Sequence, residues 1–290
     1  MNKIIKWQNL QIFIAITVLI ILIFFAGRLL KKQSTHISQY QHIQFPGHGY
    51  SINCAYLPAK ESFPVNRSVL IVYLHGLFAS CEQAFEIPNK YPFAFAATDA
   101  FPNAAFLSCD YGSPGSWCSN ADYNDITSSI EEISKSFPFS RIVITGTSMG
   151  GCTALSYAAT APEDIRNKII GVLAIYAAGD LTHLYEETKS VEVRQSLETA
   201  FHGTPKISQD QYLKTSCIAN LPTFPHQTKV YLISALKDKI IPAKLQNELF
   251  EQLKATTIPV RIETLPCYHV SIPPSESFVR GLKFVLSSGN

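Results

Sequence analysis

The chain has 290 residues, of which 47% are hydrophobic and 16% are charged, and its formal net charge is +2. This composition is typical of a globular chain long enough for one enzyme-sized domain and an extension. Lysine and arginine are scattered along the sequence, which gives no electrostatic basis for nucleic-acid binding. We therefore expect no nucleic-acid partner.

The N-terminal segment is strongly apolar. Residues 7–27 carry no charge, and Ile12–Ala26 contains one polar residue, Thr17. A helix of this length can cross a hydrocarbon layer of about 30 Å. We therefore expect residues 1–32 to form a single-pass membrane anchor with its flanks, and the lipid bilayer to be a partner of this segment.

A cleaved signal peptide is the alternative, and it would make the protein secreted. Signal peptides need a shorter apolar core and a small-residue cleavage site, for which Phe24–Gly27 is a poor match. The anchor is therefore favoured. Lys3 and Lys6 on one side balance Lys31 and Lys32 on the other, so the side of the membrane stays undecided.

Residues 33–48 are polar, rich in Gln, Ser and His, and predict a tether. Its histidines recur every six residues, a spacing that brings them together on neither a helix nor a strand. The seven cysteines contain no C-x-x-C pair, so we predict no metal site. We expect the cysteines to be small buried side chains, and a bridge between Cys109 and Cys118 stays open.

From residue 49 onwards, apolar runs alternate with helical patterns. Unbroken apolar runs rich in β-branched residues indicate strands that are buried on both faces, as in a parallel sheet covered by helices. The sequence therefore predicts one α/β domain over residues 49–290. The expected strands are 69–74, 105–107, 142–144, 169–175, 230–233 and 260–265, and the expected helices are 126–137, with Ser119 as its N-cap, 150–160 and 243–254.

Residues 178–225 separate two of the expected strands and predict a small cap insertion. Val193, Leu197 and Phe201 follow a helical spacing, which indicates short amphipathic helices over the site. Such helices shape a substrate pocket. Helices that only stabilise the core would show the same pattern, so both roles stay open.

A serine motif follows the strand expected near residue 144. Gly146 and Gly150 flank Ser148 in a G-x-S-x-G pattern, and a helix begins near Met149. Glycines at these positions remove side chains that would clash in a sharp strand-to-helix turn. The helix N-terminus favours negative charge on the exposed hydroxyl. We therefore predict that Ser148 is a nucleophile.

A serine nucleophile needs a base, and the base needs an acid that orients it. In enzymes with a serine at such a turn, the acid and then the histidine follow on loops after later strands. Asp238 follows the strand at 230–233, and His269 follows the strand at 260–265. His269 is the only histidine beyond Asp238. We therefore predict a triad of Ser148, Asp238 and His269, converging at the carboxyl edge of the sheet.

Two backbone N–H groups should bind the oxyanion that forms during acyl transfer. One belongs to Met149, which follows the nucleophile. We assign the other to Leu77 in the loop after the strand at 69–74, where Gly76 lets the chain turn inward. His75 precedes the nucleophile in the chain, so we expect it to be structural.

These motifs together resemble the α/β-hydrolase superfamily from about residue 50 to the end of the chain. Two stretches resemble its prolyl-oligopeptidase-like and esterase branch, namely Phe201–Pro205 followed by Tyr212 and Ser216, and Asp238–Pro242. The resemblance implies an α/β-hydrolase fold with a mostly parallel central sheet covered by helices. It also implies cleavage of ester or amide bonds.

We expect a serine hydrolase that acts on small esters, amides or short peptides through an acyl-enzyme on Ser148, without a metal or cofactor. One alternative is a thioesterase or lipase acting on membrane-derived acyl groups. An alternative of another class is a non-catalytic membrane-tethered binding module. The complete set of Ser148, Asp238 and His269 argues against that module.

A chain that begins near residue 33 is expected to be soluble and to keep its activity on small esters, because every predicted catalytic residue follows the tether. The full-length protein should resist extraction from membranes by salt or alkali and yield to detergent, because apolar contact would hold it. Membrane fractionation checks this. Release by salt, or a mature N-terminus near Gly27, would indicate a secreted hydrolase instead.

Overall fold

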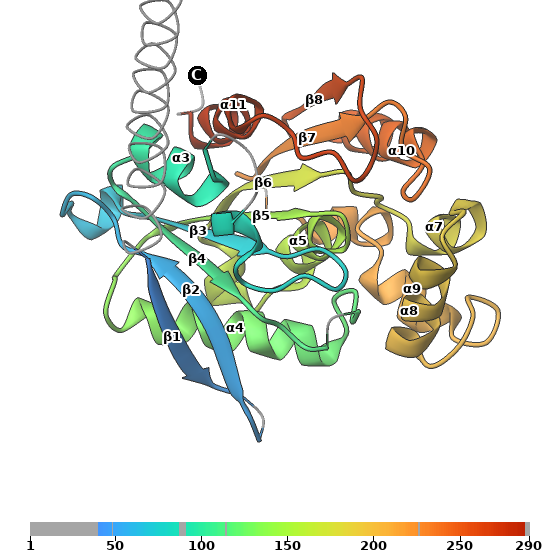
Figure 1. Cartoon of the computed structure of the whole chain (residues 1–290), viewed down its shortest axis with the longest axis horizontal. Helices are drawn as coiled ribbons and strands as arrows, with labels where there is room; N and C mark the ends of the chain where they lie inside the picture. Colours follow the sequence, from blue (N-terminus) through green and yellow to red (C-terminus); the bar gives the residue numbers. More distant parts are fainter. Residues whose placement is uncertain (1–39, 48, 87–90, 114, 226, 288–290) are drawn as a thin grey trace, which may run out of the picture. The chain divides into compact units, whose positions relative to one another are not determined.

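Figure 1 shows the computed structural model of the chain. The chain divides into two units, Met1–Gln41 and His42–Asn290, and the second is described below. The expected anchor, residues 1–32, and the expected tether up to residue 39 lie outside the described residues. Within the part that is described, no helix is long and apolar enough to cross a membrane. The structure describes residues 40–47, 49–86, 91–113, 115–225 and 227–287.

The described residues form an eight-stranded sheet with the strand order β1-β2-β4-β3-β5-β6-β7-β8. Strand β2 is antiparallel to β4, and the strands from β4 through to β8 are parallel to their neighbours. Parallel neighbours need crossover connections, which the helices supply. The strands are β1 Gln41–Pro46, β2 Ser51–Leu57, β3 Val69–Leu74, β4 Ala104–Cys109, β5 Arg141–Thr147, β6 Ile169–Ile175, β7 Lys229–Ala235 and β8 Val260–Leu265.

The expected strands are all present, and β3, β6 and β8 have the expected bounds. Strand β1 differs, because it occupies residues that we assigned to the tether. Ile43 and Phe45 pack against the core, whereas Gln44 between them is exposed. This alternation fits an edge strand with one buried face. The second unit therefore begins before residue 49, and the tether prediction is wrong for residues 41–46.

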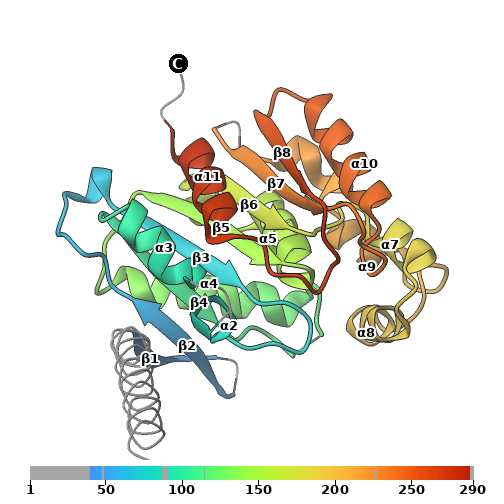
Figure 2. The same ribbon diagram turned by 45° about the horizontal axis from the view of Figure 1, so that its top comes forward.

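Helices cover both faces of the sheet (Figures 1 and 2). On one face, Phe93 of α3 stacks on Phe278 of α11 with ring centroids 4.4 Å apart. On the other, the hydroxyls of Thr127 in α4 and Tyr157 in α5 lie 2.9 Å apart. The helices outside the cap are η1 Val65–Arg67, α2 Gln83–Glu86, α3 Phe93–Ala100, α4 Asn120–Ser134, α5 Met149–Thr160, α6 Glu163–Arg166, α10 Ala243–Lys254 and α11 Ser275–Leu286.

The cap insertion lies between β6 and β7. Figures 1 and 2 show α7, α8 and α9 grouped beyond the carboxyl ends of these strands. Asp180 caps the first helix by accepting hydrogen bonds from two backbone N–H groups at 2.8 and 3.1 Å. Val193, Leu197 and Phe201 are buried, as their helical spacing predicts. The cap helices are α7 Leu181–Glu187, α8 Val191–Phe201, α9 Gln209–Thr215 and η2 Ile218–Thr223.

All seven cysteines are free thiols. Six of them are buried and behave as small apolar side chains, as expected, and Cys267 is partly exposed. Cys109 and Cys118, the pair for which a bridge was left open, are both in the thiol form. No disulfide therefore joins the described elements.

The contact between α11 and β6 depends on a glycine in the strand. A methyl group at the α-carbon of Gly171 would lie 2.5 Å from the Cβ of Val285 and 2.8 Å from its Cγ2. Val285 is 1% exposed, so it has little room to move aside. The helix can approach the sheet this closely only because Gly171 lacks a side chain.

Gly171→Ala is expected to lower the free energy of unfolding by about 1–3 kcal/mol, because the added methyl group overpacks this contact. Denaturant unfolding measures the change. Val285→Ala removes two of the three nearest atoms, so Gly171→Ala should cost less in a Val285→Ala background than in the wild type. A Gly171→Ala variant as stable as the wild type would contradict the close contact.

Candidate active site

Ser148 lies at the turn between β5 and α5. Its backbone has φ 59° and ψ −120°, which is in the left-handed range that side-chain-bearing residues rarely adopt. A residue held in such a conformation typically costs about 1–3 kcal/mol and persists only where its surroundings enforce it. The N–H of Ser148 donates to the carbonyl oxygen of Ile175 in β6 at 2.8 Å, which fixes the turn to the sheet.

The flanking glycines make this turn possible. A Cβ atom at Gly146 would lie 2.4 Å from the carbonyl oxygen of Gly150, and a Cβ atom at Gly150 would lie 2.0 Å from that of Leu74. Either side chain would push α5 away from β3. Because both are absent, α5 begins directly against the sheet and presents Ser148 at its N-terminus.

The three side chains of the predicted triad form one hydrogen-bonded chain. His269 Nε2 lies 2.8 Å from Ser148 Oγ, and His269 Nδ1 lies 2.6 Å from Asp238 Oδ2. A carboxylate only accepts hydrogen bonds, so it holds the imidazole proton on Nδ1. Nε2 is then free to accept the Ser148 hydroxyl. The Asp238 side chain has no exposed surface, and that of His269 is 11% exposed.

Asp238 is held by three further donors. Its Oδ1 accepts from the backbone N–H groups of Ile240 and Ile241, both at 2.9 Å. Its Oδ2 accepts from Gln246 Nε2 at 3.0 Å. These bonds fix the direction in which the carboxylate faces His269 before any substrate binds.

Gln246 is a site residue that the sequence analysis missed. Its Nε2 also donates to the carbonyl oxygen of Ile241 at 2.7 Å, and its Oε1 accepts from the N–H of Ala235 at 3.2 Å. It is 2% exposed and shares the buried face of α10 with three leucines. A glutamine on the apolar face of the helix after the acid was the available signal, because a buried amide needs partners.

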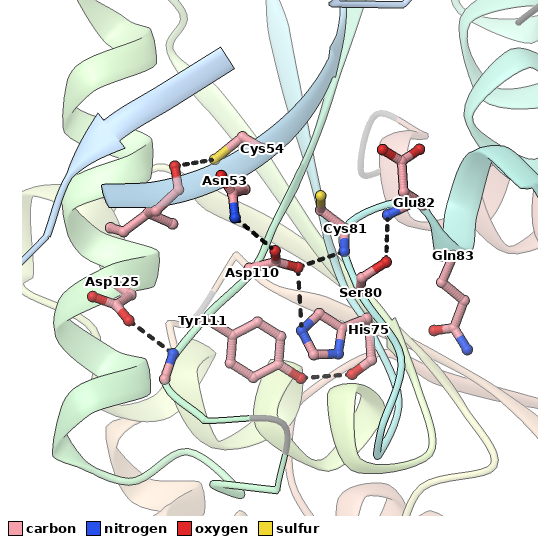
Figure 3. Close-up of polar contacts among 12 residues, drawn as sticks. Asn53, Cys54, His75, Ser80, Cys81, Glu82, Gln83, Asp110, Tyr111 and Asp125 are labelled. Atoms are coloured by element: carbon pink, nitrogen blue, oxygen red, sulfur yellow. Dashed lines mark hydrogen bonds and ion pairs between the residues drawn. The ribbon is translucent and has the colours of Figure 1, made fainter. Parts of the chain in front are cut away.

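His75 lies outside this hydrogen-bonded chain. Its ring is buried beside Tyr111, with ring centroids 4.6 Å apart, and its Nδ1 donates to the carbonyl oxygen of Gly76 at 2.9 Å. Burial lowers the pKa of His75, which favours its neutral form. Figure 3 shows the ring beside Tyr111 and facing Asp110, whose carboxylate accepts from the N–H of Cys81 at 2.7 Å. These contacts tie the loop after β3 to the loop after β4.

Two backbone donors remain available beside Ser148. Within the described part of the chain, no acceptor lies within hydrogen-bond distance of the N–H of Leu77 or Met149. Met149 is the first residue of α5, where a helix has no acceptor for its N–H groups. In contrast, the N–H of Gly76 is bonded to Gln83 Oε1 at 2.8 Å. The N–H groups predicted for the oxyanion are therefore unpaired here.

A cavity of about 570 Å³ is lined by Ser148 and His269. Val193 of α8 lines it too, so the cap forms part of its wall. Within the described residues, no group of three or more His, Cys, Asp or Glu side chains is placed to hold a metal ion. The other apolar side chains of the wall include Leu77, Phe78, Phe93, Ile240 and Ile272.

The loop after β4 is fastened to α4 by two buried carboxylates. Asp125 accepts from the N–H of Gly112, and Asp122 accepts from the N–H of Cys118, both at 2.7 Å. Burial, together with the nearby charge of Asp125, raises the pKa of Asp122 to about 7. Asp122 is therefore partly protonated near neutral pH.

The same loop touches the cap. Trp117 Nε1 donates to Ser196 Oγ of α8 at 2.7 Å. Gly115 lies between Leu77 and Ser196, because a methyl group on it would lie 3.2 Å from a side-chain atom of each. The loop thus joins α4, the cap and a residue of the cavity wall.

The fold and the site define a serine hydrolase of the α/β-hydrolase superfamily. The model of the prolyl oligopeptidase family matches residues 118–271, a little over half of the chain. The chain therefore belongs to the prolyl oligopeptidase family, as its resemblance to that branch implied. A search of curated proteins finds no match.

Solved structures share the fold. Pyrococcus horikoshii acylaminoacyl peptidase is 16% identical with a TM-score of 0.63, covering 84% of this chain and 40% of its own. A Mycobacterium tuberculosis puromycin-hydrolysing peptidase is 16% identical with a TM-score of 0.64, covering 84% and 38%. Pyrobaculum calidifontis esterase is 16% identical with a TM-score of 0.59, covering 84% and 82%. The chain thus spans about 40% of the length of the two peptidases.

Asp122→Asn is expected to flatten the pH dependence of stability. An unfolded aspartic acid ionises near pH 4, whereas folded Asp122 holds its proton to about pH 7. Unfolding between these values releases a proton, so wild-type stability falls as the pH rises through this window and then levels off. Relative to the wild type, the variant should gain about 2–4 kcal/mol from pH 4 to pH 8.

Denaturant unfolding across this pH range measures the gain, and Asp210→Asn at an exposed position is the matched control. Equal pH profiles for the wild type and Asp122→Asn would show that Asp122 is ionised in the folded protein at lower pH.

Proposed function

We propose that the chain hydrolyses ester or amide bonds of small molecules or short peptides through an acyl-enzyme on Ser148. The observation that carries this proposal is the continuous hydrogen-bonded chain from Asp238 through His269 to Ser148, which ends in a largely apolar cavity. Low polarity around the reacting atoms strengthens each electrostatic interaction there.

In the first step, Ser148 Oγ attacks the substrate carbonyl carbon as its proton passes to His269 Nε2. The imidazole becomes a cation, which the adjacent carboxylate of Asp238 stabilises. The carbonyl oxygen becomes an oxyanion, and the N–H groups of Leu77 and Met149 bind it. Collapse of this intermediate breaks the bond to the leaving group, which takes the proton from His269.

In the second step, water replaces the leaving group. His269 Nε2 accepts a proton from water as the water oxygen attacks the acyl carbon. A second oxyanion forms in the same position, and its collapse breaks the bond to Ser148 Oγ. The proton returns from His269 to Ser148, and the carboxylic acid leaves.

The family and the solved neighbours support this class of substrate. These neighbours are two peptidases and an esterase, which all transfer an acyl group to water. We also propose that residues 1–32 anchor the protein in a membrane. The uncharged run at residues 7–27 is the support for the anchor.

Ser148→Ala and His269→Ala are each expected to lower kcat on small esters by up to about a million-fold, and Asp238→Ala by about 10,000-fold. The kcat of the double variant Ser148→Ala/His269→Ala should be no lower than that of either single variant, because the three groups act as one unit. Ester hydrolysis assays measure these rates. Labelling with a fluorophosphonate, which reacts with activated serines, should disappear in Ser148→Ala.

Two matched variants serve as controls. Ser134→Ala changes a half-buried serine on α4, and His183→Ala changes an exposed histidine in the cap. Both should keep the rate and the labelling of the wild type. Undiminished labelling of Ser148→Ala would refute the proposal, and full activity of His269→Ala would assign the base to another residue.

A further inference from the structure

The cavity beside Ser148 contains an amide side chain whose orientation is fixed. Gln83 accepts hydrogen bonds from the backbone N–H of Gly76 at 2.8 Å and from the hydroxyl of Tyr73 at 3.1 Å, both on one atom. A backbone N–H can only donate, so this atom must be the amide oxygen. Tyr73 in turn lies 2.9 Å from Thr147 Oγ1, next to the nucleophile.

The amide nitrogen of Gln83 is therefore left to face the cavity, which Gln83 lines. Among the described residues, none accepts a hydrogen bond from it. Figure 3 shows the side chain extending from α2, alongside the segment that carries His75. A methyl group on Gly76 would lie 3.6 Å from Gln83 Nε2 and 3.7 Å from Ser148 Cβ. The free donor is thus close to the nucleophile.

A free donor in this position discriminates between acyl groups. A hydrocarbon chain would displace water from the Gln83 amide and offer no acceptor in its place. The amide N–H would then be left unpaired, which weakens binding. An acyl group with an acceptor oxygen would replace the lost water. A pocket suited to hydrocarbon acyl groups would be purely apolar and would have no such donor beside the serine.

We propose that Gln83 is a specificity-determining residue, which selects acyl groups that carry an acceptor oxygen a few bonds from the scissile carbonyl, as a peptide carbonyl does. Hydrocarbon acyl groups of the same length are disfavoured. This inference rests on the proposed role of Ser148 as nucleophile. It favours aminoacyl and peptidyl substrates over the fatty acyl groups of a lipase or thioesterase.

The test compares two nitrophenyl esters with the same leaving group and the same acyl chain length, those of N-acetylglycine and pentanoic acid. The quantity measured is the kcat/KM of the N-acetylglycine ester divided by that of the pentanoic acid ester. This ratio is corrected by the same ratio of the two hydroxide-catalysed rates. Gln83→Met removes both the donor and the acceptor, and Gln83→Glu keeps the acceptor for Gly76 and Tyr73. Both variants should lower this ratio about ten- to a hundredfold.

The ratio separates selection from a structural role, because a distorted loop would slow both esters equally. Gln195→Met on the exposed side of α8 is the matched control and should keep the wild-type ratio. Thermal unfolding shows which variants fold, and Gln83→Glu retains the bonds that hold the loop.

An unchanged ratio in Gln83→Met and Gln83→Glu, or an equal loss on both esters, would overturn the assignment of Gln83 while leaving Ser148 in place. Hydrolysis of the two esters that persists in Ser148→Ala would instead overturn the proposed function, and this inference with it.

Discussion

The site depends on how closely α5 approaches β3. The carbonyl oxygen of Leu74 occupies the space where a side chain of Gly150 would lie, so only a glycine allows this packing. Because α5 packs so closely, a single residue, Ser148, connects the end of β5 to the start of α5. The chain changes direction at this residue, which has φ 59°. The strain is sustained because α5 is buried along nearly its whole length. Exposure of the hydroxyl is thus a result of core packing.

The rest of the site is arranged so that little has to move when a substrate binds. Asp238 accepts from donors on its own loop and from Gln246, which also bonds the loop and the end of β7. On the other side of Ser148, Gly76 is held by Gln83. Groups that are fixed in advance need no reorganisation as charge develops, which is the main source of electrostatic stabilisation in enzymes.

Features with a strong periodic or local signal could be predicted from the sequence. The bounds of β3, β6 and β8 follow from unbroken apolar runs, and the positions of Ser148, Asp238 and His269 follow from a turn motif and strand order. Strand β1 was missed because only its alternate residues are apolar. Gln246 and Gln83 were missed for a different reason. The apolar face of α10 marks Gln246 as a buried amide that needs partners, but which backbone groups bond Gln246 or Gln83 depends on tertiary packing.

The bond between Trp117 and Ser196 has a consequence for how molecules reach the cavity. It joins the cap to a loop that is itself fastened to α4, so this side of the cap is braced against the body of the domain. The cap cannot move away from this loop without breaking the hydrogen bond between Trp117 and Ser196. We therefore expect the wall that α8 gives the cavity to stay in place when a molecule enters, which limits how wide that molecule can be.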